Sequence, residues 1–501
     1  MINKNLLKGK NVSYKKINYA NFYNGLNSDV DEYILPINRS IRTYNFNFAN
    51  GALVTGLGLK PLNLPITKTT DVSRNIVPPE NVEILASWVF RYTPNYTTFR
   101  EDYLVVLTKT GKLMVSQIYT TGSLFTEIGN VTFTDIPTIL NYKLNGNYGL
   151  LISSKSGFYS FFPEVSDKFV KVENAPNINS ICLHNERAFA TVGGNREEVW
   201  FSKELDPTNW NATLSEGGFI SFVDDRGQCN KVLSFLDRVY VFRDYGINRI
   251  TPYANQTEFD VSELYVSSGQ IHANTVCECG DRIIMLTDNG LYCFDGTSTT
   301  KLNVYINEFL SKSRNNNAIA TYYKGKYYLA CYVNFGDFKE VGSEEYKLDI
   351  HANNVLIELD VNTNMVNILR GVEITSLSVL SDDLISKLVV CSKVKGVSKI
   401  SELTYSGSVF DEPTKKVWLS PMSNFGYPEK KKFIKDIFIT SKYPITVTIR
   451  TELYSKKIKA TPINNLIHLT PKISGKQIAI DFETDLADCY ISSPTIVVGV
   501  A

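Results

Sequence analysis

The chain has 501 residues, and its 52 lysines and arginines are nearly balanced by 51 aspartates and glutamates. A net charge of +1 excludes a protein whose whole surface binds polyanions, and 43% hydrophobic residues are too many for a disordered chain. The 29 tyrosines and 27 phenylalanines, against five methionines, favour strands over helices. The composition therefore predicts a globular, β-rich protein.

Targeting and membrane signals are weak throughout the sequence. No run of about 18 or more apolar residues occurs, so we expect no membrane span. The basic N-terminus, residues 1–8, is not followed by an apolar stretch, so we expect no secretory signal peptide. The eight cysteines are widely spaced, and several lie in apolar, strand-like runs. This favours free, buried thiols in a reducing compartment over a disulfide framework.

Residues 1–80 are rich in asparagine, tyrosine and turn-forming residues and show little sustained periodicity. They predict an extended N-terminal arm with short strands, partly attached to another surface.

A short pattern then recurs over residues 81–412: a polar turn, an alternating apolar strand, a turn with glycine or asparagine, and another strand. The clearest copy covers residues 279–296. Copies begin near residues 101, 145, 185, 236, 279, 323 and 386, roughly 40–60 residues apart, a spacing within reach of propeller blades. Blades packed around an axis cover the faces of small sheets and leave only short edges. Seven copies predict a seven-bladed β-propeller, with six or eight blades and a β-sandwich array as the alternatives.

From residue 413 the pattern changes to longer alternating strands, as at residues 433–440 and 445–450. Such alternation is typical of sheets with one buried face. It predicts a C-terminal β-sandwich-like module over residues 413–501. The best candidate for a helix is short and lies at residues 307–313.

Charge is divided unevenly between these segments. Residues 413–501 contain 13 basic and seven acidic residues, a net charge of +6, whereas the rest contains 39 basic and 44 acidic residues, a net charge of −5. The plainer interpretation is a solvated lysine-rich face. The sharper one is a surface that faces DNA or an acidic partner, with salt-dependent attraction. Lys430, Lys431 and Lys432 are the candidate residues for such a surface.

A search for catalytic or ligand-binding residues finds no strong pattern. None of the four histidines has a partner at metal-ligand spacing, and Cys277 and Cys279 lack a second pair of ligands. No nucleophile elbow, phosphate-binding glycine loop or zincin helix occurs. Asp224 and Asp225 point to opposite faces if they lie on a strand, so a glycosidase pair needs a partner from another loop. We therefore expect no catalytic residue, no metal and no cofactor.

Three groups of segments together suggest a family. They are, in chain order, residues 24–36, 45–53 and 56–58; residues 199–210, 220–225 and 239–250; and residues 418–420, 425–428 and 430–433. They resemble the N-terminal arm, a blade junction and the C-terminal sheet module of bacteriophage tail propeller proteins. The chain departs from that pattern at Asn24-Gly25, where a double glycine is common, and at Leu57-Gly58-Leu59, where Arg-Pro-Gly is typical. The subfamily therefore stays open.

The resemblance implies a structural virion protein such as a podovirus tail hub, a nozzle, or a head-completion protein that stabilises packaged DNA. It implies a homo-oligomeric ring below the portal, with six copies as one option. The expected partners are the portal, adaptor or other tail proteins, and packaged DNA without sequence specificity. The protein is expected to be made in the bacterial host cytoplasm and to reside in the virion. The alternatives are a receptor- or glycan-binding adsorption module and a glycan-acting propeller hydrolase.

Five residues of these segments have expected structural roles. Asp206 caps a turn in which Pro207 fixes φ at the second position, and Trp210 folds back as an apolar plug. Trp418 is expected to anchor the core of the C-terminal module. Gly426 is expected in a tight turn before Tyr427 and Pro428.

Overall fold

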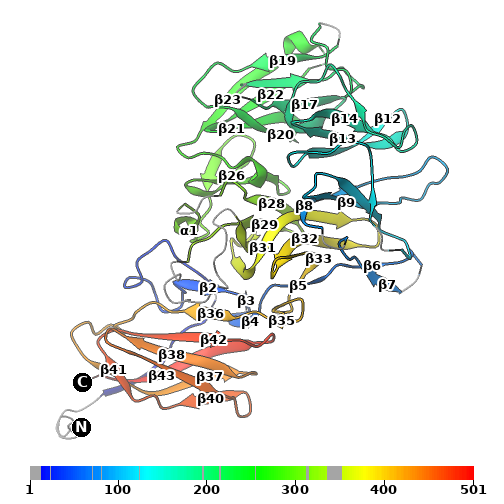
Figure 1. The fold of residues 1–501 in the computed structure, drawn as a ribbon. Helices are drawn as coiled ribbons and strands as arrows, with labels where there is room; N and C mark the ends of the chain where they lie inside the picture. Colours follow the sequence, from blue (N-terminus) through cyan, green and yellow to red (C-terminus); the bar gives the residue numbers. More distant parts are fainter. Residues whose placement is uncertain are drawn as a thin grey trace.

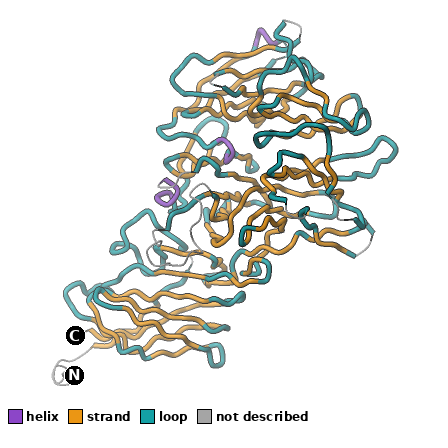
Figure 2. The backbone as a smooth tube through the Cα atoms, viewed as in Figure 1, coloured by secondary structure: helices purple, strands orange, loops and turns teal. Residues whose placement is uncertain are grey.

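The computed structural model places a wheel of small sheets next to a two-layer β-sandwich (Figures 1 and 2). It describes residues 13–22, 24–69, 72–79, 82–122, 125–194, 197–213, 216–253, 255–311, 315–335 and 352–500. Figure 2 shows that strands and their connections make up almost all of this part of the chain.

Five blades of the wheel are four-stranded antiparallel sheets built from consecutive strands. Blade 1 contains β8 (Ile84–Phe90), β9 (Tyr103–Thr108), β10 (Leu113–Gln117) and β11 (Thr126–Glu127). Blade 2 contains β12 (Thr138–Leu144), β13 (Asn147–Ser154), β14 (Gly157–Phe161) and β15 (Val170–Lys171). Blade 3 contains β16 (Ile178–His184), β17 (Arg187–Val192), β18 (Glu198–Phe201) and β19 (Gly218–Ser221). Blade 4 contains β20 (Cys229–Phe235), β21 (Arg238–Arg243), β22 (Gly246–Thr251) and β23 (Asp260–Val266). Blade 5 contains β24 (Cys277–Glu278), β25 (Ile283–Thr287), β26 (Gly290–Phe294) and β27 (Thr299–Lys301).

The last two blades share one long strand. Blade 6 contains β28 (Ile319–Tyr323), β29 (Lys326–Cys331), β30 (Asn353–Asp360) and the first half of β31 (Val366–Ser381). The second half of β31 pairs with β32 (Ser386–Val394), which continues to β33 (Val397–Thr404) and to β5 (Gly58–Pro61) as blade 7. Gly371, with φ of +104°, lies where β31 passes from one partner strand to the other. The fold is therefore a β-propeller, as predicted, and the pairing gives seven blades.

The wheel is closed by contacts between segments far apart in the sequence. The Ser87 N–H of β8 donates to Ser376 Oγ of β31 at 2.9 Å, and the Ser87 hydroxyl lies within 3.1 Å of the hydroxyls of Ser376 and Ser378. Blade 7 is completed by β5, in which Leu59 is buried and pairs with Leu403 of β33. Blades 1 and 7 are thus held together by polar contacts at the inner strands, while the N-terminal arm supplies an outer strand.

The sequence repeats correspond to one position in every blade. The seven predicted starts fall at or just before the second strands, namely β9, β13, β17, β21, β25, β29 and β32. The predicted short helix is α1 (Asn307–Ser311), and two 3₁₀ turns occur as η2 (Gln256–Glu258) and η3 (Ala273–Thr275). Among the described residues, no helix has the length and apolar character needed to cross a membrane.

The sandwich combines the C-terminal strands with strands of the arm. One sheet contains β1 (Ser13–Asn18), β3 (Phe46–Ala49), β4 (Ala52–Thr55), β37 (Lys432–Ser441), β40 (Leu466–Leu469), β41 (Ile473–Gly475) and β43 (Tyr490–Val500). The other contains β2 (Arg42–Tyr44), β36 (Lys416–Leu419), β38 (Ile445–Thr451), β39 (Ser455–Ala460) and β42 (Ile478–Thr484). A hairpin of β6 (Asn63–Pro65) and β7 (Ser73–Asn75) lies beside the wheel, and β34 (Ser408–Val409) and β35 (Glu412–Pro413) extend the edge of blade 7.

The core of the sandwich includes residues from both ends of the chain. Trp418 is fully buried and packs edge-on against Phe22, with ring centroids 4.9 Å apart, and against Phe48 at 5.8 Å. The hydroxyl of buried Tyr19 accepts the Ile480 N–H at 2.9 Å. Because these arm side chains belong to the core, the sandwich cannot reach this packing without residues 13–55.

One exposed turn of blade 5 gives a pH-dependent prediction. Asp295 accepts hydrogen bonds from the backbone N–H groups of Ser298 and Thr297 and from both hydroxyls, at 2.7–2.8 Å. These donors hold the pKa of Asp295 well below its ordinary value. A lowered pKa in the folded state stabilises the fold fully above the ordinary aspartate pKa of about 3.9, and this contribution is lost as the pH falls.

We expect Asp295→Asn to lower the free energy of unfolding near neutral pH by less than about 1 kcal/mol, since water screens the exposed carboxylate. Urea unfolding of both proteins between about pH 3 and about pH 7 measures the difference, which should shrink toward the acidic end. A difference that stays constant or grows on acidification would contradict the assigned role of the charge.

Candidate functional site

The loop between β18 and β19 carries the motif that resembles a family blade junction. Asp206 Oδ1 accepts the Thr208 N–H at 3.0 Å and the Thr208 hydroxyl at 2.6 Å. Pro207 is buried, and its carbonyl accepts the indole N–H of Trp210 at 2.8 Å. Asp206 and Pro207 thus form a compact turn that returns Trp210 toward the wheel.

Trp210 joins two blades. Its side chain is 1% exposed and meets Phe158 of β14 edge-on, with ring centroids 5.8 Å apart at 86°. The same apolar cluster includes Leu151 of blade 2 and Ile178 of blade 3. The motif therefore fills the seam between blades 2 and 3, so its residues act through packing.

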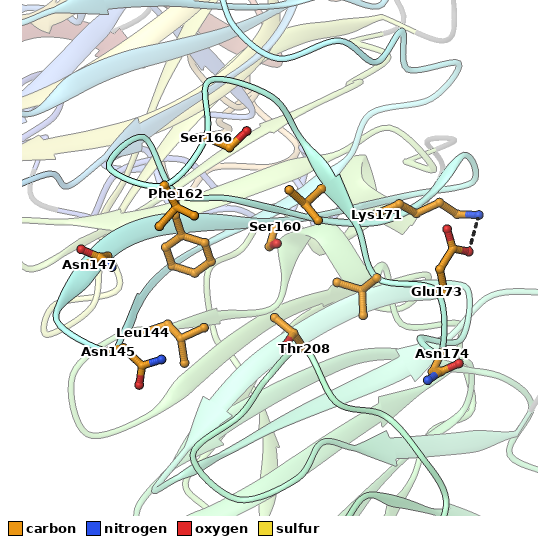
Figure 3. Close-up of a pocket in the computed structure, with 13 residues that line it drawn as sticks. Leu144, Asn145, Asn147, Ser160, Phe162, Ser166, Lys171, Glu173, Asn174 and Thr208 are labelled. Carbon is orange, nitrogen blue, oxygen red and sulfur yellow. Dashed lines mark hydrogen bonds and ion pairs between the residues drawn. The ribbon is translucent and has the colours of Figure 1, made fainter.

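A hollow of about 490 Å³ lies beside this seam, and Thr208 forms part of its wall (Figure 3). Phe162 and Leu144 contribute apolar surface, while Lys171 and Glu173 form an ion pair of 3.1 Å at another part of the rim. The other lining residues are Asn145, Asn147, Ser160, Val165, Ser166, Val170, Val172 and Asn174. The lining can bind by apolar contact and amide hydrogen bonds, and its two charged side chains neutralise each other.

A second hollow, of about 460 Å³, is lined by residues of consecutive blades: Thr138, Asn179, Asn230, Asn274 and Asn316. Asn179 and Asn230 occupy equivalent register shifts at the start of β16 and β20. Because these are inner strands, the hollow lies at one end of the propeller axis. Repeated amide side chains, together with Lys231, Asp244 and His272, give it a polar wall, which the repeat pattern did not predict.

Asp224, considered above for a glycosidase pair, is engaged in ion pairs within the fold. Arg243 is fully buried, forms an ion pair with Asp224, and donates to the Gly227 carbonyl at 2.9 Å. Burial raises the pKa of Asp224, but the Arg226 backbone N–H and the guanidinium groups of Arg243 and Arg226 lower it by more. Asp224 is thus held as a carboxylate within the fold, a state that suits ion pairing better than proton donation.

The three consecutive lysines do not share one environment. Lys430 and Lys431 are exposed, and the Lys430 ammonium lies 5.9 Å from the centre of the Tyr427 ring. Lys432 is fully buried, and its ammonium donates to the Tyr427 carbonyl at 2.7 Å. The prediction that Lys432 faces DNA or a partner is therefore wrong. Lys432 begins β37, where strand alternation turns it inward together with Ile434.

The turn before these lysines contains Gly426. Phe425 and Gly426 have φ of 50° and +80°, and the Gly426 N–H donates to Asn424 Oδ1 at 2.8 Å. Two successive positive φ values describe a tight turn in which glycine is the favoured residue. The carbonyl of the next residue, Tyr427, accepts the Lys432 ammonium, which ties this turn to the start of β37.

No protein-family model matches the sequence, and no curated protein matches it. Raptor from Chaetomium thermophilum is one similar solved structure, with a TM-score of 0.42 and 10% identity over 72% of this chain and 29% of Raptor. The AfRom2 CNH domain has a TM-score of 0.38 and 9% identity over 65% of this chain and 99% of that domain. BBS1N, solved in complex with ARL6DN, has a TM-score of 0.39 and 12% identity over 69% of this chain and 96% of that chain. The fold assignment rests on the strand pairing of this chain.

Proposed function

We propose that the chain is a structural protein of a bacteriophage tail, which forms a homo-oligomeric ring below the portal as a hub, nozzle or head-completion component. The observation that carries the proposal is where the family-like segments lie. The arm segments join the sandwich and blade 7, residues 199–210 reach the seam between blades 2 and 3, and residues 418–433 enter the sandwich. Each lies where two parts of the molecule are joined, as expected if the resemblance concerns a scaffold.

The architecture suits a tail protein that must resist deformation by mechanical force. The wheel is closed between blades 1 and 7, and the arm contributes strands to both the wheel and the sandwich. Pulling the sandwich away from the wheel would therefore have to break β-sheet pairing as well as side-chain packing. Such a molecule can hold a fixed opening while DNA is retained or released.

Packaged DNA is proposed as a partner bound without sequence specificity. The sandwich module carries a net charge of +6, and Lys430 and Lys431 stand exposed on it. Lysine contacts to phosphates give affinity that falls as salt rises and carry no sequence information.

A receptor- or glycan-binding module is the second candidate, and one observation favours it. The hollow beside blades 2 and 3 combines Phe162 with the amides of Asn145, Asn147 and Asn174. An aromatic face with neighbouring amides can hold a sugar ring by packing and hydrogen bonds. Reproducible glycan binding that is lost in Phe162→Ala would favour this function over the first.

Quantitative mass spectrometry of gradient-purified particles tests the main proposal. We expect peptides from the wheel and from the sandwich at equal abundance, in several copies per portal ring. Host lysate proteins of similar abundance serve as the control for carry-over. Absence from particles that contain the portal would contradict the proposal.

A further inference from the structure

The near-zero net charge of the chain hides a strong separation of charge. Blades 3 and 4, residues 176–267, contain 13 acidic and eight basic residues, a net charge of −5. The sandwich module, residues 413–501, carries a net charge of +6. The remaining residues have a net charge of zero. Figure 1 shows β17 and β21–β23 at one end of the molecule and the sandwich at the other. The molecule is therefore elongated with oppositely charged ends.

The acidic end presents a surface that we call the acidic face, formed by Glu186, Glu204, Leu205, Leu236 and Asp237. All five residues are exposed, Leu205 by 64% and Leu236 by 60%. The Leu205 N–H donates to the Glu186 carbonyl at 2.7 Å, which fixes the loop after β18 against the β16–β17 turn. His184 Nδ1 lies 2.9 Å from Ser234 Oγ and ties this turn to the β20–β21 turn, where Leu236 and Asp237 lie.

Two of the three carboxylates of the acidic face, those of Glu186 and Glu204, lie close to each other. A hydrogen bond with the carboxyl group of Glu204, and the negative charge of that group, raise the pKa of Glu186. Two guanidinium groups lie at this face, because Arg187 is 3.6 Å from Glu204 and Arg238 donates to the Asp237 carbonyl at 2.7 Å, so the three carboxylates exceed them by one charge. A further cation from outside would relieve this repulsion.

The basic end presents a complementary surface that we call the basic edge, formed by Leu453, Tyr454, Lys456, Lys457 and Lys459. Leu453 is 81% exposed and Tyr454 48% exposed at the tip of the β38–β39 hairpin. The three lysines lie on β39, with Lys457 and Lys459 on one face of the strand and Lys456 on the other, and Lys457 contacts Glu483 at 2.8 Å. β39 is the last strand of its sheet, and its outer edge has no strand partner among the described residues. Lysines on such an edge repel a second basic edge and suit an acidic surface.

The two surfaces share the make-up of an interface: exposed apolar side chains surrounded by charge, with opposite sign on the two sides. They lie at opposite ends of one molecule, so each can meet the other only in a second copy. We propose that the basic edge of one copy docks on the acidic face of the next copy, head to tail. This rests on the proposed ring, because a head-to-tail contact closes into a ring when the rotation between copies permits and otherwise extends as a filament.

Charge reversal tests this docking on the full chain. One variant carries Lys456→Glu, Lys457→Glu and Lys459→Glu, and the other carries Glu186→Lys, Glu204→Lys and Asp237→Lys. Sedimentation velocity at about 50 mM and about 500 mM salt measures assembly. We expect the unmodified chain to assemble at the lower salt, and each variant alone to associate at least about tenfold more weakly.

Mixing the two variants gives the decisive result. The reversed β39 of the lysine variant is acidic and can dock on the reversed, basic surface of the other variant. The unchanged basic edge of that other variant can dock on the unchanged acidic face of the lysine variant. The mixture should therefore assemble again, with the two variants alternating. The matched control is Lys16→Glu, Lys435→Glu and Lys442→Glu, which makes the same charge change at exposed lysines outside β39 and should assemble normally. Near-ultraviolet circular dichroism verifies that each variant is folded.

Three results would overturn the proposal: an unmodified chain that stays monomeric, variants that assemble as well as the unmodified chain, or a mixture that fails to recover. If the basic edge instead bound DNA, reversal would abolish a DNA mobility shift, and mixing would not restore assembly. Rescue by mixing together with absence from particles would leave the docking intact and refute only the virion role.

Discussion

Trp210→Ala should destabilise the propeller by about 3–5 kcal/mol, the cost typical of removing a large aromatic side chain from a packed core. Trp210 is 1% exposed, meets Phe158 across the seam between blades 2 and 3, and donates its indole N–H to Pro207. Its removal leaves a cavity at the seam and a buried carbonyl without its donor. Urea unfolding of the full chain, followed by circular dichroism, measures the loss.

A neighbouring tryptophan provides the matched control. Trp200 is only partly buried, stacks on Phe219 with centroids 5.0 Å apart, and donates to Glu198 at 2.9 Å. Trp200→Ala should cost about 1 kcal/mol, because the site is open to water and can relax. Equal costs for the two substitutions would show that the seam does not depend on Trp210.

Asp481→Ala should destabilise the sandwich by about 3–5 kcal/mol, since it removes one partner of a buried ion pair. Asp481 is 1% exposed, lies 2.6 Å from Arg450 Nε, and accepts the Ser420 N–H at 2.9 Å. Within the described part of the chain, the guanidinium of Arg450 would keep only Glu32 of the arm, at 3.7 Å, as a carboxylate partner. Thermal unfolding should show a lower midpoint for the transition that involves the sandwich.

Glu483→Ala is the control for this substitution because it lies on the same strand, β42. Glu483 contacts Lys457 at 2.8 Å and Lys415 at 3.7 Å, and both lysines are more than half exposed. Its loss should cost no more than about 1 kcal/mol, as for other surface ion pairs. If Glu483→Ala were as costly as Asp481→Ala, burial of the Arg450 pair would not explain the stability of the sandwich.

The sequence predicted the second strand of every blade because those strands have strong local signals. Residues 279–296, for example, combine an unbroken apolar strand, a turn at Asp288-Asn289-Gly290 and a second apolar strand. The outer strands are harder to predict because several are very short, such as β11 and β15 with two residues each. The pairing of β5 with β33 was beyond prediction, since it joins segments more than 300 residues apart through long-range contacts alone.

At the candidate site, the sequence predicted the positions of large apolar side chains, because such side chains are usually buried. Trp210 and Trp418 are large apolar residues next to turns, and both lie in cores. Lys432 was misassigned because a run of three lysines suggests a uniform surface. The available signal was strand alternation, since Lys432 shares the inward parity of Ile434. The basic edge was missed because a net charge of +6 gives the amount of charge without its position.

We propose that this closed propeller and sandwich work as repeated copies in a phage tail. A cryo-EM reconstruction of purified particles at side-chain resolution tests it most directly. We predict a ring below the portal, in which each copy shows seven blades with β5 in the last, and each sandwich contacts blades 3 and 4 of its neighbour. A ring at that position built from a different fold, with no density for this chain elsewhere in the particle, would contradict the account.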